Sequence, residues 1–321
     1  MTAIRTRNLT KRFDEDVIAV DGLDLRVEAG EVFGFLGPNG AGKSTVIDML
    51  LDFVRPTEGD VTVLGNDPAI DAERIRRQTG VLPEGASLYA RLTGREHVEW
   101  IGRANGATVD ADALLGRVGL TRDEADRAVG GYSKGMRRRL ALAMALIGDP
   151  ELLILDEPSA GLDPTGMREF REIVRAEADD GRTVFFSSHI LGEVEAVCDR
   201  IGILNDGHLV ATGTPDELRS NLDLGGTISV DVARVPDDLA LDAIGGVEEV
   251  TVDETTITAS LTDSTRKIDV VSELDERTRV LDITSTGTSL ERLFETYTSS
   301  EREELPATDD ELTAARIGVG R

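Results

Sequence analysis

The segment GPNGAGKST follows a short apolar run and combines a glycine-rich turn with a lysine and two hydroxyl side chains. A loop of this type turns its backbone N–H groups around a β-phosphate, while the lysine contacts the β and γ oxygens and the serine hydroxyl binds Mg²⁺. A structural turn without a ligand is the alternative. The strand predicted before it and the helix predicted after it favour a nucleotide site. The expected site residues are Gly37, Pro38, Asn39, Gly40, Ala41, Gly42, Lys43, Ser44 and Thr45.

Two neighbouring carboxylates form a second candidate site. Asp156 and Glu157 directly follow the apolar run LLIL. At the exposed end of a buried strand beside a phosphate loop, Asp156 would hold Mg²⁺ and Glu157 would polarise the attacking water. Such a pair can also be a solvated strand end. The phosphate loop earlier in the chain favours the catalytic interpretation.

The elements that must position these residues are those of a parallel α/β sheet. Short apolar runs near Gly, Pro or Asp predict buried strands at Val32–Leu36, Leu152–Leu155 and Thr183–Ser187. A helix is expected over Thr45–Val54, directly after the phosphate loop. Further helical patterning covers Gly94–Gly116 and Lys134–Ile147.

A different pattern begins after Ser220–Gly226, where apolar residues alternate as in half-buried strands. The order of elements is similar to a split β-α-β-β-α-β sandwich. It includes helices at Leu239–Ile244, Ile268–Leu274 and Ser289–Tyr297, the last capped by Thr288 and Glu291, and a strand at Val280–Ile283. We therefore expect a first domain over 1–218, a small α+β domain over 219–298 and an acidic, disordered tail over 299–321.

The charge balance excludes several classes of partner. With 61 Asp plus Glu against 35 Lys plus Arg, the net charge is −26, so direct binding to nucleic acid or to anionic lipid is not expected. The acid excess suggests a cytoplasm at high salt.

The single cysteine, Cys198, fits a small buried apolar residue in a reducing compartment. No apolar run reaches the roughly 18 residues of a membrane helix, so any membrane role would come through a partner.

A further motif, YSKGM at Tyr132–Met136, allows a family to be named. With the phosphate loop and LLILDEP, it resembles the signature of the ATP-binding subunits of ABC transporters. In that family, Ser133 and Gly135 at a helix N-terminus would face the γ-phosphate of ATP held by an opposing subunit. Lys134 and Met136 replace the commonest signature residues, a variant typical of subunits that pair with separate permeases.

The resemblance implies four further roles. Phe13 would stack on adenine, although a lone aromatic can equally be core. The segment SAGLD, Ser159–Asp163, would cross the dimer interface, and His189 would touch the γ-phosphate. Glu84 stands where the family usually has the glutamine that contacts Mg²⁺. The other two histidines, His97 and His208, are expected at the surface.

The fold class implied is a P-loop ABC cassette, with a mixed sheet and a helical subdomain at about 85–147, followed by the small α+β domain. The chain would bind and hydrolyse ATP with Mg²⁺ as a dimer, a homodimer being expected, and drive transport, expected to be export, through a separate membrane permease. It would be cytoplasmic, on the inner face of the membrane. The permease would meet Leu88, Tyr89, Leu92 and Trp100, unless these form the subdomain core. The alternatives are a soluble ABC-type ATPase without a permease and an inactive binding module.

Overall fold

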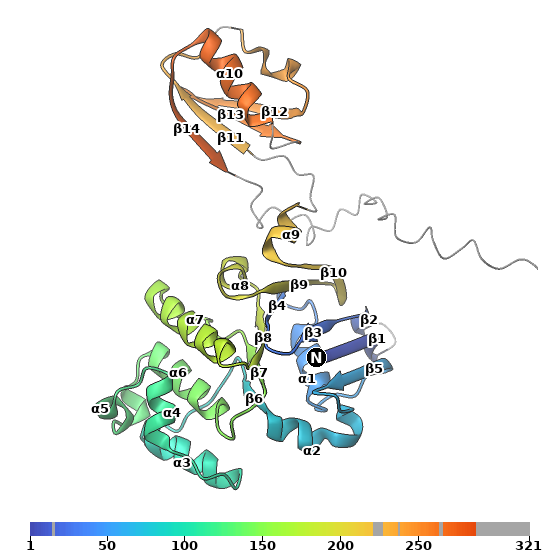
Figure 1. The fold of residues 1–321 in the computed structure, drawn as a ribbon, viewed down its shortest axis with the longest axis vertical. Coiled ribbons are helices and arrows are strands. Elements are labelled where there is room, and N and C mark those ends of the chain that lie inside the picture. The colour runs from blue at the N-terminus through green and yellow to red at the C-terminus, as the bar shows by residue number, and fades with distance from the viewer. Residues whose placement is uncertain (15–16, 221–226, 237, 263–265, 287–321) are drawn as a thin grey trace, which may run out of the picture.

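A six-stranded sheet forms the centre of the molecule, in the order β10-β9-β4-β8-β7-β6 (Figure 1). The computed structural model describes residues 1–14, 17–220, 227–236, 238–262 and 266–286. Five strands run parallel, and β10 pairs antiparallel with β9 at the edge. The strands are β4 (Val32–Leu36), β6 (Thr79–Leu82), β7 (Leu152–Asp156), β8 (Thr183–Ser188), β9 (Arg200–Asn205) and β10 (His208–Gly213).

Side-chain alternation along these strands builds a separate core on each face of the sheet. Phe33 and Phe35 of β4 pack with α1 (Lys43–Leu50) and with a smaller antiparallel sheet. Val32 and Leu36 belong to the core on the opposite face. The smaller sheet consists of β1 (Thr2–Asp14), β2 (Val17–Leu23), β3 (Arg26–Glu28) and β5 (Glu58–Val63), and α2 (Pro68–Gln78) follows it.

Helices cover the second face of the main sheet and extend away from it as a helical subdomain (Figure 1). The subdomain contains α3 (Gly94–Ala104), α4 (Ala111–Arg117), α5 (Arg122–Ala125), a 3₁₀ turn η1 (Val129–Gly131) and α6 (Lys134–Ala145). Two helices, α7 (Pro164–Asp179) and α8 (Leu191–Val197), complete this face.

The helical patterning over Gly94–Gly116 corresponds to two helices, α3 and α4, rather than to one continuous element. Asn105 ends α3, and Gly106 follows with a φ of 67°, a left-handed conformation that stops the helix. Asp110 then caps α4 by accepting a hydrogen bond from the Ala113 N–H.

The helix expected over Thr45–Val54 is displaced, since α1 spans Lys43–Leu50.

The surface position expected for His97 is wrong: this side chain is 1% exposed. Its Nδ1 lies 2.7 Å from Thr93 O and its Nε2 accepts from the Tyr89 N–H at 2.9 Å, so local backbone partners satisfy the buried ring. Cys198 is buried as expected, and burial raises the pKa of its thiol.

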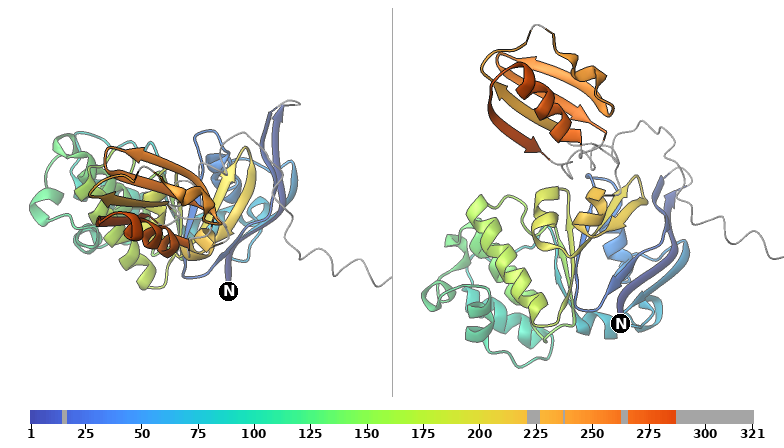
Figure 2. Two further views of the ribbon diagram at one scale, coloured as in Figure 1. Left: turned by 90° about the horizontal axis from the view of Figure 1, so that it is seen from above. Right: turned by 45° about the horizontal axis from the view of Figure 1, so that its top comes forward.

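The C-terminal residues form a small α+β unit with its own core (Figure 2). After α9 (Pro215–Ser220), inside which the expected boundary at 218 falls, the elements are β11 (Thr227–Val232), η2 (Ala240–Ala243), β12 (Val247–Asp253), β13 (Thr256–Leu261), α10 (Lys267–Arg277) and β14 (Val280–Thr286). The sheet is antiparallel in the order β12-β13-β11-β14. The helix expected at 289–297, its capping box and the acidic tail lie outside the described residues.

Among the described residues, none of the helices has the length and apolar character that spanning a bilayer requires.

Candidate functional site

The carboxyl ends of four neighbouring strands bring most of the candidate residues to one edge of the main sheet. The phosphate loop follows β4, and His189 follows its neighbour β8. Asp156 ends β7, with Glu157 directly after it, and Glu84 follows β6. Ligands of parallel α/β sheets bind at this edge, where the loops converge.

The phosphate loop is held in a tight turn at the start of α1. Gly42 has a φ of 107°, and a Cβ on it would lie 2.3 Å from Ala19 O, so the position requires glycine. Lys43 is 6% exposed, and its ammonium donates to Gly37 O at 2.7 Å and to Pro38 O at 3.2 Å. The lysine is therefore folded into the loop, where a phosphate would meet both its charge and the N–H groups of the turn.

Glu157 lies at the centre of the cluster. Its φ of 45° is left-handed, and its N–H donates to both the carbonyl and the hydroxyl of Ser187 at 3.2 Å. The buried carboxylate is 3.4 Å from Lys43 Nζ through Oε1 and 2.8 Å from His189 Nδ1 through Oε2. Glu157 Oε1 has no hydrogen-bond donor among the described residues. A strained backbone at this position directs the carboxylate into the site.

Asp156 is oriented by its neighbours on β8 and α1. The Ser187 hydroxyl donates to Asp156 Oδ1 at 2.6 Å. Burial, and secondly the charge of Asp156, raise the pKa of Asp48 on α1. The charge of Asp156 therefore lies close to α1, the helix that begins at the phosphate loop.

Known proteins with a similar sequence align with most of this chain. Residues 20–160 match the family described as ABC transporter. The daunorubicin/doxorubicin resistance ATP-binding protein DrrA of Streptomyces peucetius is 43% identical over 225 residues, which are 68% of this chain and 68% of that protein. The chain belongs to the ABC transporter family, as an ATP-binding protein. Members of this family are ATPases, and this chain is one.

Two further likenesses define how far the ABC assignment extends. The linearmycin resistance ATP-binding protein LnrL of Bacillus subtilis is 34% identical over 302 residues, covering 91% of this chain and 96% of that protein. A solved structure of the ATP-binding subunit of an ABC transporter aligns with a TM-score of 0.60 and 30% identity, over 68% of this chain and 93% of that one. The fold expected from the sequence, an ABC cassette, is thereby confirmed.

The signature segment of the ABC cassette lies at the start of α6. Ser133 is the N-cap, and its hydroxyl accepts from the Met136 N–H at 3.2 Å. The chain packs α1 and α6 against opposite faces of the main sheet, so Ser133 and Gly135 belong to a different layer from the phosphate loop. Lys134 lies over the segment SAGLD: a Cβ on Gly161 would be 1.8 Å from Lys134 Nζ.

Two candidates lie at the periphery of the site. Phe13, near the end of β1, is 52% exposed, with Lys11 Nζ 5.1 Å from its ring centroid. The ring is exposed, so the core alternative is wrong, and stacking on adenine stays a prediction. The carboxylate of Glu84 is exposed, while its backbone carbonyl accepts from Arg138 at 2.9 Å.

Sequence reasoning missed two buried charged residues behind the site, Arg138 on α6 and Glu193 on α8. Glu193 Oε2 accepts from the hydroxyls of Ser159 and Ser188, which joins the segment SAGLD to the loop of His189. The partners of Arg138 are distant in sequence, as is Ser159 from Glu193. One signal could have identified Arg138: helical periodicity assigns its position to the core, yet the residue is charged.

Proposed function

We propose that the cluster around Glu157 hydrolyses MgATP. The observation that carries the proposal is the position of the Glu157 carboxylate between Lys43 and His189 at the carboxyl ends of β4, β7 and β8. Glu157 would take the proton of the attacking water, and His189 would orient that carboxylate and contact the γ-phosphate. Lys43 would compensate the charge of the β and γ oxygens, and Phe13 would stack on adenine.

The donor set fits a Mg²⁺ ion that protein and nucleotide hold together. Among the described residues, no group of three or more His, Cys, Asp or Glu is arranged to bind a metal. Magnesium is commonly held by one or two protein oxygens together with substrate phosphates. The exposed hydroxyl of Ser44 and the carboxylate of Asp156 would supply those oxygens, with Glu84 a further candidate at the same edge. The ion would neutralise charge that develops on the phosphates.

A second copy of the chain would complete the site. Ser133 is exposed at the N-terminus of α6, where its hydroxyl and backbone N–H groups of the first turn can donate hydrogen bonds to a phosphate. Since α6 and the phosphate loop pack on opposite faces of the sheet, a partner chain is the natural source of the second phosphate contact. Two chains would then enclose two nucleotides, with the segment SAGLD near the interface.

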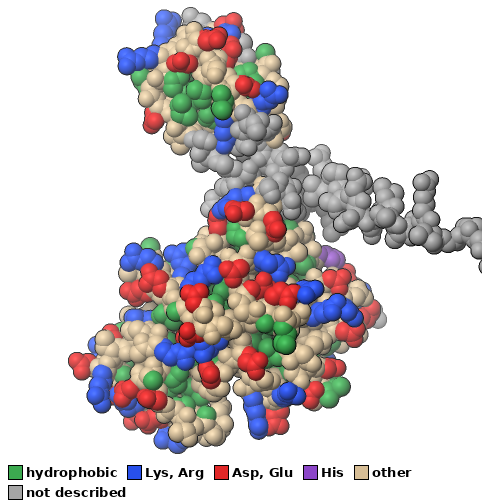
Figure 3. All heavy atoms as spheres, in the orientation of Figure 1, with side chains coloured by type: hydrophobic (Ala, Val, Ile, Leu, Met, Phe, Trp, Pro, Cys, Tyr) green, Lys and Arg blue, Asp and Glu red, His purple; other side chains and the backbone are tan. Residues whose placement is uncertain are grey.

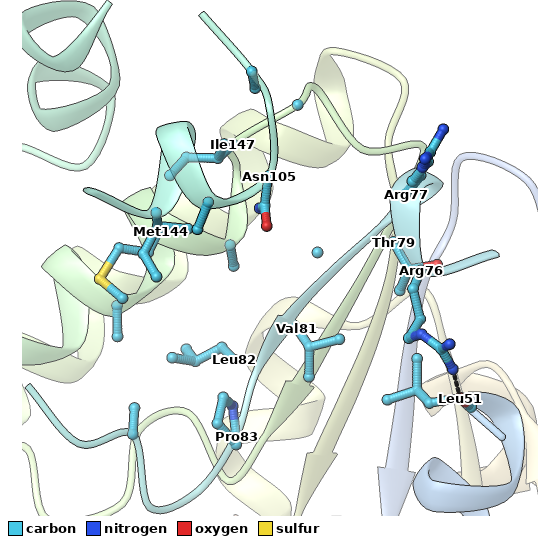
Figure 4. Close-up of a pocket in the computed structure, with 18 of the residues that line it drawn as sticks. Leu51, Arg76, Arg77, Thr79, Val81, Leu82, Pro83, Asn105, Met144 and Ile147 are labelled. Carbon is cyan, nitrogen blue, oxygen red and sulfur yellow. Dashed lines mark hydrogen bonds between the residues drawn. The ribbon is translucent and has the colours of Figure 1, made fainter. Parts of the chain in front are cut away.

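A groove beside the helical subdomain would receive the permease. A cavity of 760 Å³ lies between α2, the segment after β6 and the last turns of α6. Figure 4 shows Met144 and Ile147 on one wall, Arg76 near Leu51 on the other, and Val81 between them. We expect a short helix of a separate membrane protein to dock there and to be moved by the ATP cycle, driving export.

The four residues expected to meet the permease do not all line this groove. Leu88 lines the groove, whereas Tyr89 and Trp100 lie outside it in an exposed edge-to-face contact with ring centroids 5.5 Å apart. Leu92 is half-buried. The docking proposal therefore rests on Leu88 and the groove rather than on the aromatic pair.

The test separates a transport subunit from a soluble ATPase. The full chain with Ala104→Arg, an exposed groove residue, is compared with Ile70→Arg, 79% exposed on α2 outside the groove. Affinity purification from detergent-solubilised membranes should recover a multi-span membrane protein with the wild type and the Ile70 variant, and much less with the Ala104 variant. Recovery of no membrane protein alongside normal Mg²⁺-dependent ATPase activity would favour a soluble ATPase. Loss of ATPase activity in all preparations would point to an inactive module.

A further inference from the structure

Arg138 joins two loops of the nucleotide site through its guanidinium group. It lies in the second turn of α6 and is 9% exposed. A guanidinium has five N–H donors, and the structure uses all five on backbone carbonyl oxygens. The acceptors are the carbonyls of Pro83, Glu84, Asp156, Glu157 and Pro158.

The five hydrogen bonds divide between two strand ends. On the β6 side, Nη1 donates to Pro83 O at 3.0 Å and to Glu84 O at 2.9 Å. On the β7 side, Nε donates to Pro158 O at 2.6 Å, and Nη2 donates to Asp156 O at 3.1 Å and to Glu157 O. One rigid planar group therefore fixes the separation of the two loops.

Burial of this cation is costly unless its donors are satisfied. Desolvation lowers the pKa of Arg138, which the nearby charges of Asp156, Glu84 and Glu157 partly oppose. Lysine, with three donors on one nitrogen, cannot reach five acceptors on two sides. The position thus calls for arginine through its geometry as well as through its charge.

The two loops perform different tasks. The loop after β7 carries Glu157, whose left-handed backbone is held at its carbonyl by Arg138. The loop after β6 continues from Pro83 to Leu88, and both of these residues line the groove beside the helical subdomain. Displacement of one loop would therefore strain the hydrogen bonds between Arg138 and that loop. The guanidinium would shift in response, and with it the other loop.

We propose that Arg138 is a positioning residue that couples the segment 83–88 to the Glu157 carboxylate. Occupancy of the groove would alter hydrolysis through this guanidinium, and the state of the nucleotide site would alter the groove through the same bonds. The identity of the groove's occupant rests on the proposed function. The link between the two loops does not, because it is intrinsic to this chain.

The first test is the steady-state kinetics of MgATP hydrolysis by the purified full chain. Arg138→Gln should lower kcat by about 10- to 100-fold, because small misplacements of a catalytic group cost rates of this order, while KM for ATP changes by less than about threefold. Arg138→Lys should give an intermediate kcat. The matched control is Arg139→Gln, which removes a hydrogen bond to Gly119 O and an ion pair with Glu169 on α7, both away from the two loops, and should leave both constants unchanged.

The second test is hydrogen–deuterium exchange with Mg²⁺ and a non-hydrolysable ATP analogue. In the wild type, the nucleotide should change amide protection both at 154–158 and at 83–88. In both Arg138 variants the change at 154–158 should persist while that at 83–88 is lost. Should the glutamine variant not fold, the lysine variant decides the question alone.

Two results would overturn the proposal: a wild-type kcat in the Arg138 variants, or a retained response at 83–88. The assay contains no membrane protein. A failure of permease docking and a failure of this coupling are therefore observed in separate experiments.

Discussion

Lys43 Nζ lies 3.4 Å from Glu157 Oε1, so the phosphate loop and the strand end of β7 meet in one buried ion pair. Both side chains are less than one-tenth exposed. Their opposite charges offset the cost of burying each of them. A γ-phosphate that draws Lys43 towards itself would leave Glu157 with His189 as its remaining basic neighbour. The carboxylate is then free to accept a proton from water.

Replacing Glu157 with Gln should keep ATP binding and lower hydrolysis by about 10²- to 10⁴-fold, the usual contribution of a positioned general base. The amide keeps the shape of the side chain but cannot take a proton. Nucleotide affinity by equilibrium binding and phosphate release by a colorimetric assay measure the two effects separately. Glu151→Gln, at the opposite end of the same strand, is the control. Hydrolysis by the Glu157 variant at close to the wild-type rate would exclude the assigned role.

Asp48→Asn should stabilise the fold at neutral pH. Burial and the charge of Asp156 raise the pKa of Asp48, so the folded state holds this proton more tightly than the unfolded state. The resulting stability is present at low pH and is lost as pH rises through the raised value. Because asparagine mimics the protonated form, the melting temperature of the variant should exceed that of the wild type near pH 8, and the two should converge as the pH falls below the ordinary aspartate pKa of about 3.9.

Thermal melts across that pH range check this prediction, with the exposed Asp60→Asn as the control. A constant difference between wild type and the Asp48 variant at every pH would contradict the electrostatic explanation.

We expect the melting temperature to rise between about 0.1 M and about 2 M KCl, because the screening length falls from about 10 Å to 3 Å or less. The net charge of −26 makes repulsion the dominant long-range term. Figure 3 shows acidic and basic side chains interspersed over the cassette face in view, so salt also weakens local attractions there. A flat or falling curve would contradict adaptation to high salt. Glycerol at matched viscosity controls for non-ionic effects.

Ending the chain after Ser220 should leave ATP affinity unchanged and make turnover more dependent on protein concentration. The cut retains Leu218, which is 3% exposed in the cassette core, and the C-terminal unit has a core of its own. Leu281 and Ile283 on β14 are about half exposed, a surface that can support association. Sedimentation and ATP titration of both forms measure the two effects. A folded truncated chain that fails to bind ATP would refute the proposed division into domains.

The sequence anticipated the strand Val32–Leu36 to the residue, because a continuous apolar run bounded by polar residues and glycine leaves little freedom of register. It placed Asp156, Glu157 and His189 at strand ends for the same reason. Their roles on ATP stay predictions.

The interruption between α3 and α4 and the burial of His97 depended on local backbone contacts that periodicity does not encode. Arg138 was missed for a related reason. Its five acceptors are carbonyl groups, which every residue carries, so no side-chain pattern in the sequence marks the partners.

The dimensions of α6 have a mechanical consequence. The helix has 12 residues and is therefore about 18 Å long. Ser133 caps its N-terminus, and Met144 in its last turn lines the groove. If a helix of this length pivots by about 10° about one end, the other end moves by about 3 Å. This is close to the donor–acceptor distance of a hydrogen bond. A small angular change of the helical subdomain would thus be sufficient to make or break the proposed contact of Ser133 with a phosphate.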